Sequence, residues 1–236
     1  MKFFTDITTN ASQFCLLNIK KYYDPRKENK KIVFVDPGVY ELKKHQEYSH
    51  IELLHQLAQG ELKENEYLSI DYPCDMNLQY ADEFIAKSIE NNLRYAENPQ
   101  YICTIQFRFQ DFDSFRENWE HLECWVNFPQ KIIGIGNLCR IMYPNEFTNA
   151  VFEYIISHTS KGQRIHFYGL SLRLIKTYIP LLERAGLVIT LDSTKWTKAV
   201  TNTLKLAHGV CCQKATRDLY FFSYMDEIRP YCEIQY

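Results

Sequence analysis

Three aspartates and one glutamine stand where apolar runs of the sequence end, in positions that could carry acid–base or nucleophilic chemistry. They are Asp36, Asp71, Gln106 and Asp192. A carboxylate that follows an apolar run is costly unless it is solvated or hydrogen-bonded, although a turn or a helix cap explains any one aspartate equally well. Two carboxylates can serve as nucleophile and general acid or base at a glycosidic bond. An Asp–Gln pair can also donate and accept along the edge of a guanine-like base.

The segments that must position these residues repeat one unit: a short apolar run, a polar turn and a helical pattern. The predicted strands cover 32–36, 67–71, 101–106, 131–136, 164–169 and 187–192. Helical patterns follow the first five at about 49–59, 77–96, 111–122, 145–158 and 171–185. Residues 13–19 in front and 219–224 behind are further predicted strands. This alternation predicts a parallel sheet covered by helices.

About eight strands favour a closed (β/α)8 barrel of the TIM type, with an open doubly wound sheet as the alternative. We expect one compact α/β domain over residues 1–236, without an added RNA-binding domain. Active sites of such barrels lie at the carboxyl ends of the strands. Glycine in the segment 134–138 would let its backbone approach a ligand closely. The predicted strand-end residues are Asp36, Asp71, Gln106, Gly134, Gly136, Gly169 and Asp192.

Composition limits the partners and the compartment. The formal net charge of -2 gives no global basic surface for nucleic acid. A local patch could supply one, or could equally be a solvated helix face: Lys195, Lys198, Lys205, Lys214 and Arg217. The aromatic share of 15% suits either a ring-stacking site or an ordinary core. Eight cysteines without a CxxC pair, no signal peptide and no apolar stretch of ~20 residues favour a cytoplasmic protein with free thiols and no membrane partner.

Several short motifs carry a resemblance to the tRNA-guanine transglycosylases and their DNA-modifying relatives. The run IGIGNL at 133–138 resembles the segment that holds the base in that family. The runs RIHFYGL at 164–170, GLV at 186–188 and LDST at 191–194 resemble the region of its nucleophile. The form DSTKW at 192–196 is most similar to the branch that inserts deazapurines into DNA. The resemblance covers about residues 32–200, with one motif at each predicted strand.

This resemblance implies an enzyme that exchanges guanine in DNA for a 7-deazaguanine base such as preQ0. Asp192 would be the nucleophile on C1′, and Asp36, in the run DPG, the general acid and base. The family has the turn Asp-Ser-Gly-Gly at this point, where this chain has DPGV at 36–39, so the acid–base loop differs here. Tyr40 or Tyr72 would stack on the base, or else pack the core or the rim. The base-recognition residues that the resemblance implies are Asp71, Gln106, Gly134, Gly136, Asn137, Leu138 and Gly169.

Other functions remain open from the sequence. They are the same exchange on tRNA, a glycosylase or transferase acting on nucleosides or nucleotides, and a non-enzymatic barrel that binds a base or a partner protein. Duplex DNA would require extrusion of the target base, and helper proteins or a homodimer are further partners. The tRNA enzymes carry a Cys-rich structural zinc site. Here the candidate ligands include adjacent cysteines, a poor tetrahedral set, so we expect no cofactor: His208, Cys211, Cys212 and Cys232.

Three further residues have an ordinary explanation beside a functional one. His166 lies within a predicted strand and is expected to be an interior histidine of the barrel. Cys74 stands near the predicted mouth, where a buried thiol is the simpler expectation. Arg140 follows the base-holding segment and would either meet a phosphate or lie on the surface.

Overall fold

The structure is a computed structural model that describes residues 1–6, 12–38, 42, 46–74, 78–123, 128–192 and 222–231. Its strands are β1 (Lys2–Asp6), β2 (Phe14–Asn18), β3 (Ile32–Asp36), β4 (Glu66–Leu68), β5 (Cys103–Ile105), β6 (Ile132–Ile135), β7 (Arg164–Phe167) and β8 (Val188–Asp192). Its α-helices are α1 (Ile51–Gln56), α2 (Ala81–Tyr95), α3 (Phe112–Glu120), α5 (Glu146–Ser157) and α6 (Leu172–Arg184). Short helical turns are η1 (Ile19–Lys21), η2 (Pro25–Asn29), η4 (Leu57–Glu61), η5 (Leu78–Tyr80) and η7 (Arg229–Tyr231).

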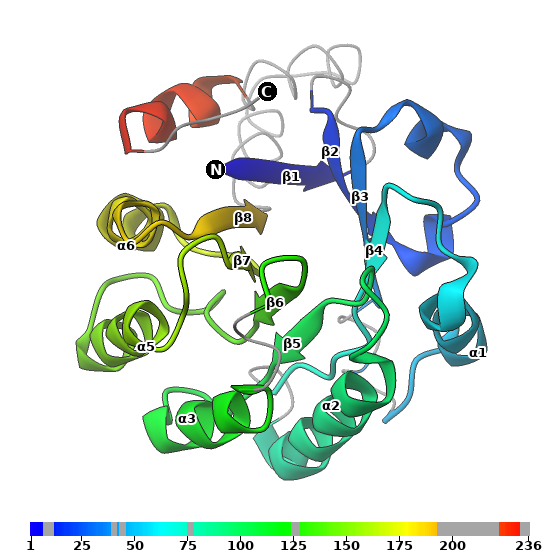
Figure 1. The fold of residues 1–236 in the computed structure, drawn as a ribbon, viewed down its shortest axis with the longest axis horizontal. Coiled ribbons are helices and arrows are strands. Elements are labelled where there is room, and N and C mark those ends of the chain that lie inside the picture. Colours follow the sequence, from blue (N-terminus) through cyan, green and yellow to red (C-terminus); the bar gives the residue numbers. More distant parts are fainter. Residues whose placement is uncertain are drawn as a thin grey trace, which may run out of the picture.

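The strands form one parallel sheet of eight strands in the order β4-β3-β2-β1-β8-β7-β6-β5. The sheet curls until β4 and β5 approach each other, and the α-helices lie around its outside (Figure 1). The α/β class and the parallel sheet are therefore confirmed. A fully closed barrel is not, because the pairing between the edge strands is a single bridge from Leu68 to Tyr101. Its two hydrogen bonds run from Leu68 N to Gln100 O at 3.0 Å and from Ile102 N to Leu68 O at 2.8 Å.

The gap between β4 and β5 has a local cause, because side chains occupy the backbone groups that a ladder would use. The Ile70 N–H donates to the Tyr101 hydroxyl at 3.2 Å, and the Ile70 carbonyl accepts from Asn91 Nδ2 at 3.0 Å. Asn92 bonds both the N–H and the carbonyl of Thr104. Asn91 and Asn92 lie on α2, which packs across this seam. The sheet is therefore joined there through a helix.

One predicted strand is wrong, and one strand was not predicted. Residues 222–228 are helical, whereas the sequence analysis places a strand over 219–224. Met225 and Ile228 are both buried, which is the three-residue spacing of one helix face. The strand that was not predicted is β1, which pairs with β2 and β8 at the centre of the strand order. Its apolar run of two residues is short and flanked by polar residues, so the sequence gives little signal there.

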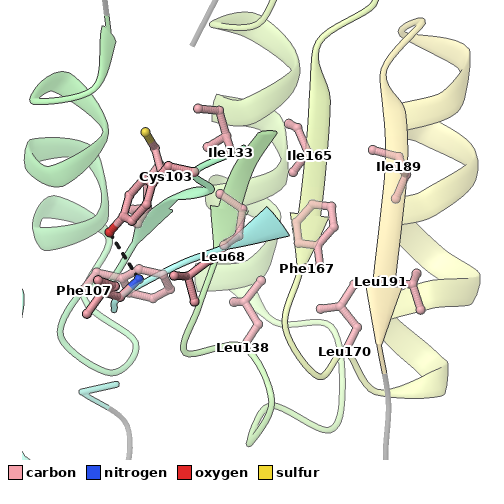
Figure 2. Close-up of a cluster of buried hydrophobic side chains, with 14 of the residues drawn as sticks. Leu68, Cys103, Phe107, Ile133, Leu138, Ile165, Phe167, Leu170, Ile189 and Leu191 are labelled. Atoms are coloured by element: carbon pink, nitrogen blue, oxygen red, sulfur yellow. Dashed lines mark hydrogen bonds between the residues drawn. The ribbon is translucent and has the colours of Figure 1, made fainter. Parts of the chain in front are cut away.

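Two apolar clusters fill the two faces of the sheet. The larger one lies between the strands and the helices and includes Ile133, Ile165 and Phe167 (Figure 2). The smaller one contains Phe4, Phe14, Phe34, Ile102 and Ile132. Phe4 on β1 stacks on Phe34 on β3, with ring centroids 4.1 Å apart. Because β2 separates these strands, the smaller cluster must lie on the concave face.

Capping residues follow the strand-end loops closely and fix where the helices begin. Asp111 accepts the Ser114 N–H at the start of α3. Asn145 forms a capping box with Thr148 at the start of α5, and Ser171 accepts the Leu174 N–H at the start of α6. Each cap satisfies a helix N–H that would otherwise lack a partner. The loops after β5, β6 and β7 are therefore anchored at both ends.

Candidate functional site

Alternation along the strands places the predicted residues on the concave face. Side chains of a strand point to the same face at every second position. Phe34 belongs to the concave cluster, so Asp36 shares its face at the end of β3. His166 contacts the Phe34 ring from β7, so Tyr168, two positions later, faces the same interior. These polar side chains of the concave face therefore lie at the carboxyl ends of the strands, next to the smaller apolar cluster. We call them the polar layer.

Asp71 and Gln106 form a buried hydrogen-bonded pair in this layer. Gln106 Nε2 donates to Asp71 Oδ2 at 2.6 Å, and Ser69 Oγ donates to Asp71 Oδ1 at 2.6 Å. The Tyr48 hydroxyl donates to the backbone carbonyl of Asp71. Burial raises the pKa of Asp71, and the bonds from Ser69 and Gln106 offset only part of that rise. Asp71 is therefore a carboxyl group held by neutral donors.

The Gln106 amide is hydrogen-bonded through its nitrogen, whereas its oxygen has no hydrogen-bond partner among the described residues. A Cβ atom on Gly136 would stand 2.4 Å from Gln106 Nε2, so glycine at this position makes room for the amide. Gln106 Oε1 is buried and has no hydrogen-bond partner among the described residues. A buried acceptor without a partner carries a desolvation penalty. A ligand with an N–H donor would remove that penalty.

Asp192 ends β8, and its contacts with the described residues go to Oδ1. The Gly169 N–H donates to Asp192 Oδ1 at 3.0 Å, and His166 Nε2 lies 3.6 Å from the same oxygen. Gly169 has a φ of 74°, a left-handed conformation that glycine adopts without strain. The structure thus brings Gly169 and Asp192 together, as their strand-end positions predict.

Tyr168 contacts the Asp71 pair through Ser69. Its hydroxyl lies 3.1 Å from Ser69 Oγ, which itself bonds Asp71. Burial raises the pKa of Tyr168, and the carboxylates of Asp71 and Asp192 add to the rise. A Cβ atom on Gly134 would stand 2.8 Å from the Tyr168 ring, so this glycine makes room for the tyrosine.

Asp36 joins the same group of carboxyls from the other side. It is half-buried, and its Oδ1 accepts the Gly38 N–H at 2.9 Å. Burial raises the pKa of Tyr48, with further contributions from the carboxylates of Asp71 and Asp36. The charges of Asp71 and Asp36 thus both raise the pKa of Tyr48. In the same way, the charges of Asp71 and Asp192 both raise the pKa of Tyr168. The three predicted aspartates converge on one end of the curled sheet.

The remaining predicted residues hold the loop after β6. Leu138 is fully buried, and Asn137 donates through Nδ2 to the Phe107 carbonyl. The Gly136 N–H donates to the Ile105 carbonyl at 3.1 Å and so continues the ladder between β5 and β6. Recognition of a base by these residues stays a prediction.

The two candidate stacking tyrosines differ in what can be said of them. Tyr72 is buried against Tyr48 and Phe84, and its hydroxyl donates to Glu47. This environment is the core or rim packing that was the alternative for Tyr72. Tyr40 lies outside the described residues.

Four polar residues of the site were not predicted from the sequence to belong to it. Ser69, Tyr168 and Thr190 lie on the concave face beside the predicted residues, and Tyr48 lies in the loop before α1. Two of them could have been found, because Ser69 and Thr190 stand two positions before Asp71 and Asp192, a spacing that shares one face in the predicted strands 67–71 and 187–192. Tyr48 carries no such signal, since its contact with Asp71 comes from a loop.

The zinc-site and basic-patch hypotheses stay predictions from the sequence. Among the described residues, no cluster of three or more His, Cys, Asp or Glu side chains could hold a metal ion. The four zinc candidates and the lysine patch all lie outside those residues: His208, Cys211, Cys212, Cys232, Lys195, Lys198, Lys205, Lys214 and Arg217. Cys74 is a buried thiol whose Sγ contacts the carbonyls of Tyr72 and Ala81. Within the described ranges, no helix has the length and apolar character needed to cross a bilayer.

Comparisons with family models, with curated proteins and with solved structures give no match to this chain. The geometry at the carboxyl ends of the strands and the motifs of the sequence therefore remain as the indications of function.

Proposed function

We propose that this chain is a nucleobase transglycosylase that exchanges guanine in DNA for a 7-deazaguanine base, through a glycosyl ester on Asp192. In this proposal the curled sheet works as a (β/α)8 barrel with its active site at the carboxyl ends of the strands. The observation that carries the proposal is the buried pairing of Asp71 with Gln106 at the end of the sheet where Asp192 Oδ1 accepts the Gly169 N–H.

The reaction divides between two carboxyl groups. Asp192 attacks C1′ of the target nucleoside, the C1′–N9 bond breaks, and its electron pair leaves on N9 of guanine. Asp36 donates a proton to the departing base and later accepts one from N9–H of the incoming base. N9 of that base then attacks C1′, and the bond from C1′ to Asp192 breaks to restore the carboxylate. The product keeps the original configuration, because two inversions follow each other.

The Asp71 and Gln106 side chains suit the edge of a guanine-like base. Gln106 Oε1 is a buried acceptor without a partner in the described part of the chain, and a purine N–H would supply one. Asp71 Oδ1 and Oδ2 each retain a lone pair beyond the bonds from Ser69 and Gln106. Guanine and 7-deazaguanines such as preQ0 carry adjacent N–H donors on one edge. The same pair would therefore accept both the outgoing and the incoming base.

Arginine and aromatic side chains around the same end favour a polymer as the substrate. Arg140, in the loop after β6, lies over the Phe109 ring at 5.5 Å. Arg173, at the start of α6, lies 3.8 Å from the ring of Tyr143, which is 59% exposed. Guanidinium groups bind phosphates, and exposed rings stack on unpaired bases. DNA is proposed as the polymer because residues 192–196 resemble the DNA-modifying branch.

The test offers radiolabelled preQ0 or guanine with duplex DNA, single-stranded DNA or bulk tRNA, each with wild type and Asp192→Asn. Asp113→Asn on α3 is the matched control, because Asp113 is an exposed aspartate outside the site. Label incorporated into DNA by wild type and Asp113→Asn, and lost with Asp192→Asn, supports the proposal. Incorporation into tRNA alone would keep the chemistry and replace the polymer. Absence of label from every polymer would overturn base exchange by this chain.

Intact-mass spectrometry provides a second measurement on the same samples. A denaturing quench during turnover should capture wild-type chain with the mass of the substrate fragment attached. Asp192→Asn should never carry that mass. An adduct that persists in Asp192→Asn would assign the nucleophile to another residue.

A further inference from the structure

His166 is a buried imidazole between two strand-end features. It lies among the rings of Phe4, Phe34 and Tyr168, with centroids at 5.7, 4.8 and 4.4 Å. Nδ1 is 3.0 Å from Thr190 Oγ1, and Nε2 is 3.6 Å from Asp192 Oδ1. Nε2 has no hydrogen-bond partner among the described residues, because its 3.6 Å separation from Oδ1 is longer than a hydrogen bond. The ring therefore spans from Thr190 to Asp192, two residues of the same strand face.

The partners of the ring decide which nitrogen carries the proton. A neutral imidazole has one donor and one acceptor. If the Thr190 hydroxyl donates to Nδ1, then Nε2–H points at the carboxylate. The opposite tautomer would place the Nε2 lone pair against Asp192. The Thr190 hydroxyl is also placed to donate to the Ile165 carbonyl at 3.3 Å, and donation there would put the ring proton on Nδ1. The contact to Nδ1 is shorter, at 3.0 Å, and favours donation to the ring.

We propose that Thr190 and His166 form a positioning relay that fixes Asp192 Oδ1 and so selects Oδ2 as the attacking oxygen. The role of Oδ2 as the attacking oxygen rests on the proposed function. The relay from Thr190 through His166 to Oδ1 rests on the contacts alone. The Gly169 N–H and His166 Nε2 both approach Oδ1. Within the described part of the chain no hydrogen bond reaches Oδ2.

The relay acts most strongly when Asp192 leaves the sugar. After Oδ2 has attacked C1′, Oδ1 is the carbonyl oxygen of the ester. When the incoming base displaces the ester, the electron pair of the C1′–Oδ2 bond passes to the carboxylate. The Gly169 N–H that already bonds Oδ1, and a His166 Nε2–H that closes on the same oxygen from 3.6 Å, stabilise the charge that develops there. His166 is thus a positioning residue that speeds the departure of Asp192.

The first test measures the tautomer in wild-type protein, labelled with nitrogen-15 on histidine. The Asp192→Asn variant should shift the Nε2 resonance of His166, and Asp36→Asn should leave it in place. Observation of the Nδ1–H tautomer in wild type would overturn the relay. This measurement needs no substrate, so its result is independent of whether base exchange occurs.

The second test uses variants in the exchange assay. His166→Phe keeps a flat ring without donors, and His166→Gln returns an N–H donor near the Nε2 position. We expect turnover to fall by about 10- to 100-fold in His166→Phe, with the Asp192 adduct accumulating, and to recover partly in His166→Gln. Loss of turnover without adduct in both variants would refute the role in the departure of Asp192.

A milder variant guards against a simple folding defect. Thr190→Val removes the hydroxyl while keeping the shape of the side chain, and Thr5→Val is the control at a similarly buried threonine on β1. Thr190→Val should slow turnover several-fold and accumulate adduct, and Thr5→Val should do neither. Equal effects of the two changes would mean that the relay contributes only to packing.

Discussion

Two buried carboxylates at the two ends of β4 are held in opposite ways. Glu66 begins the strand, and it accepts bonds from Lys27 Nζ at 2.8 Å, the Tyr22 hydroxyl at 2.6 Å and the Lys63 N–H at 3.2 Å. Burial acts to raise the pKa of Glu66, but these bonds outweigh it, so the pKa is lowered. Asp71 follows the end of the strand. Its side-chain donors among the described residues are the neutral Ser69 and Gln106, and burial raises its pKa.

The difference separates a structural carboxylate from a reactive one. A buried carboxylate with a cation at hydrogen-bond distance is compensated in the folded state. Lys27 Nζ also lies 3.5 Å from the centroid of the Tyr22 ring. The charge of Glu66 is therefore already compensated by side chains of the protein, and a ligand would gain little by binding there. In the described part of the chain, no cation forms a hydrogen bond with Asp71 or Gln106, and the buried Gln106 Oε1 has no partner. An uncompensated group of this kind is typical of a site that binds a ligand.

The largest effect is expected from Lys27→Met, which removes the cation and keeps most of the side-chain volume. Glu66 would then be buried without a counter-charge, and the free energy of unfolding should fall by about 3–5 kcal/mol. Urea denaturation measures the change. Lys63→Met is the control, since its ion pair with Glu28 is exposed and its loss should matter little. A fully stable Lys27→Met would show that Glu66 needs no cation.

Asp71→Asn should separate activity from stability. The Gln106 amide can turn to present Oε1 to the new amide, so stability should stay within about 1 kcal/mol of wild type. Base exchange should fall by at least about 100-fold, because the carboxyl group is lost from the base edge. Glu66→Gln should do the reverse, with stability lowered by about 1–3 kcal/mol and activity retained. If Asp71→Asn and Glu66→Gln changed exchange activity and stability to the same extent, the distinction between a reactive Asp71 and a structural Glu66 would be wrong.

Gly136→Ala should damage the reactive end through crowding. The added Cβ would stand 2.4 Å from Gln106 Nε2 and push the amide away from Asp71. We expect about 1–3 kcal/mol of destabilisation, together with loss of exchange activity. The double variant Gly136→Ala with Gln106→Ala removes the crowded amide and should regain stability without regaining activity. No stability gain in the double variant would place the strain elsewhere.

The smallest effect expected is a pair of opposite pH dependences. The lowered pKa of Glu66 stabilises the fold above its unfolded value of about 4.3, and this stabilisation is lost as pH falls through the native pKa. The raised pKa of Asp71 means that stability falls as pH rises from about 3.9 through the native pKa. Each pKa unit is worth about 1.4 kcal/mol.

Urea denaturation across the acid range checks these signs against the neutral variants. The stability of wild type minus that of Glu66→Gln should increase with pH. The stability of wild type minus that of Asp71→Asn should decrease with pH. Two differences of the same sign would contradict the assignment of charges at the ends of β4.

The sequence determined most of the strands and the residues at their ends. Apolar runs predicted β2, β3, β4, β5, β6, β7 and β8 to within a few residues, because a buried parallel strand must be apolar on both faces. The polar residue after each run marked the carboxyl end, where Asp36, Asp71, Gln106 and Asp192 are found. β1 escaped prediction, and the run at 219–224 was misread, since short aromatic runs fit a strand or a helix.

Only the tertiary structure decided what each polar residue meets. Glu66 and Asp71 stand close together in the sequence, and nothing local distinguishes a paired carboxylate from an open one. The curl of the sheet brings Gln106 to Asp71 from 35 residues away, and the turn η2 brings Lys27 to Glu66 from 39. His166 reaches Asp192 in the same way, from the neighbouring strand. Strand periodicity is local, whereas partners depend on strand order, register and curvature, so the chemistry of each carboxyl group is fixed only when the chain folds.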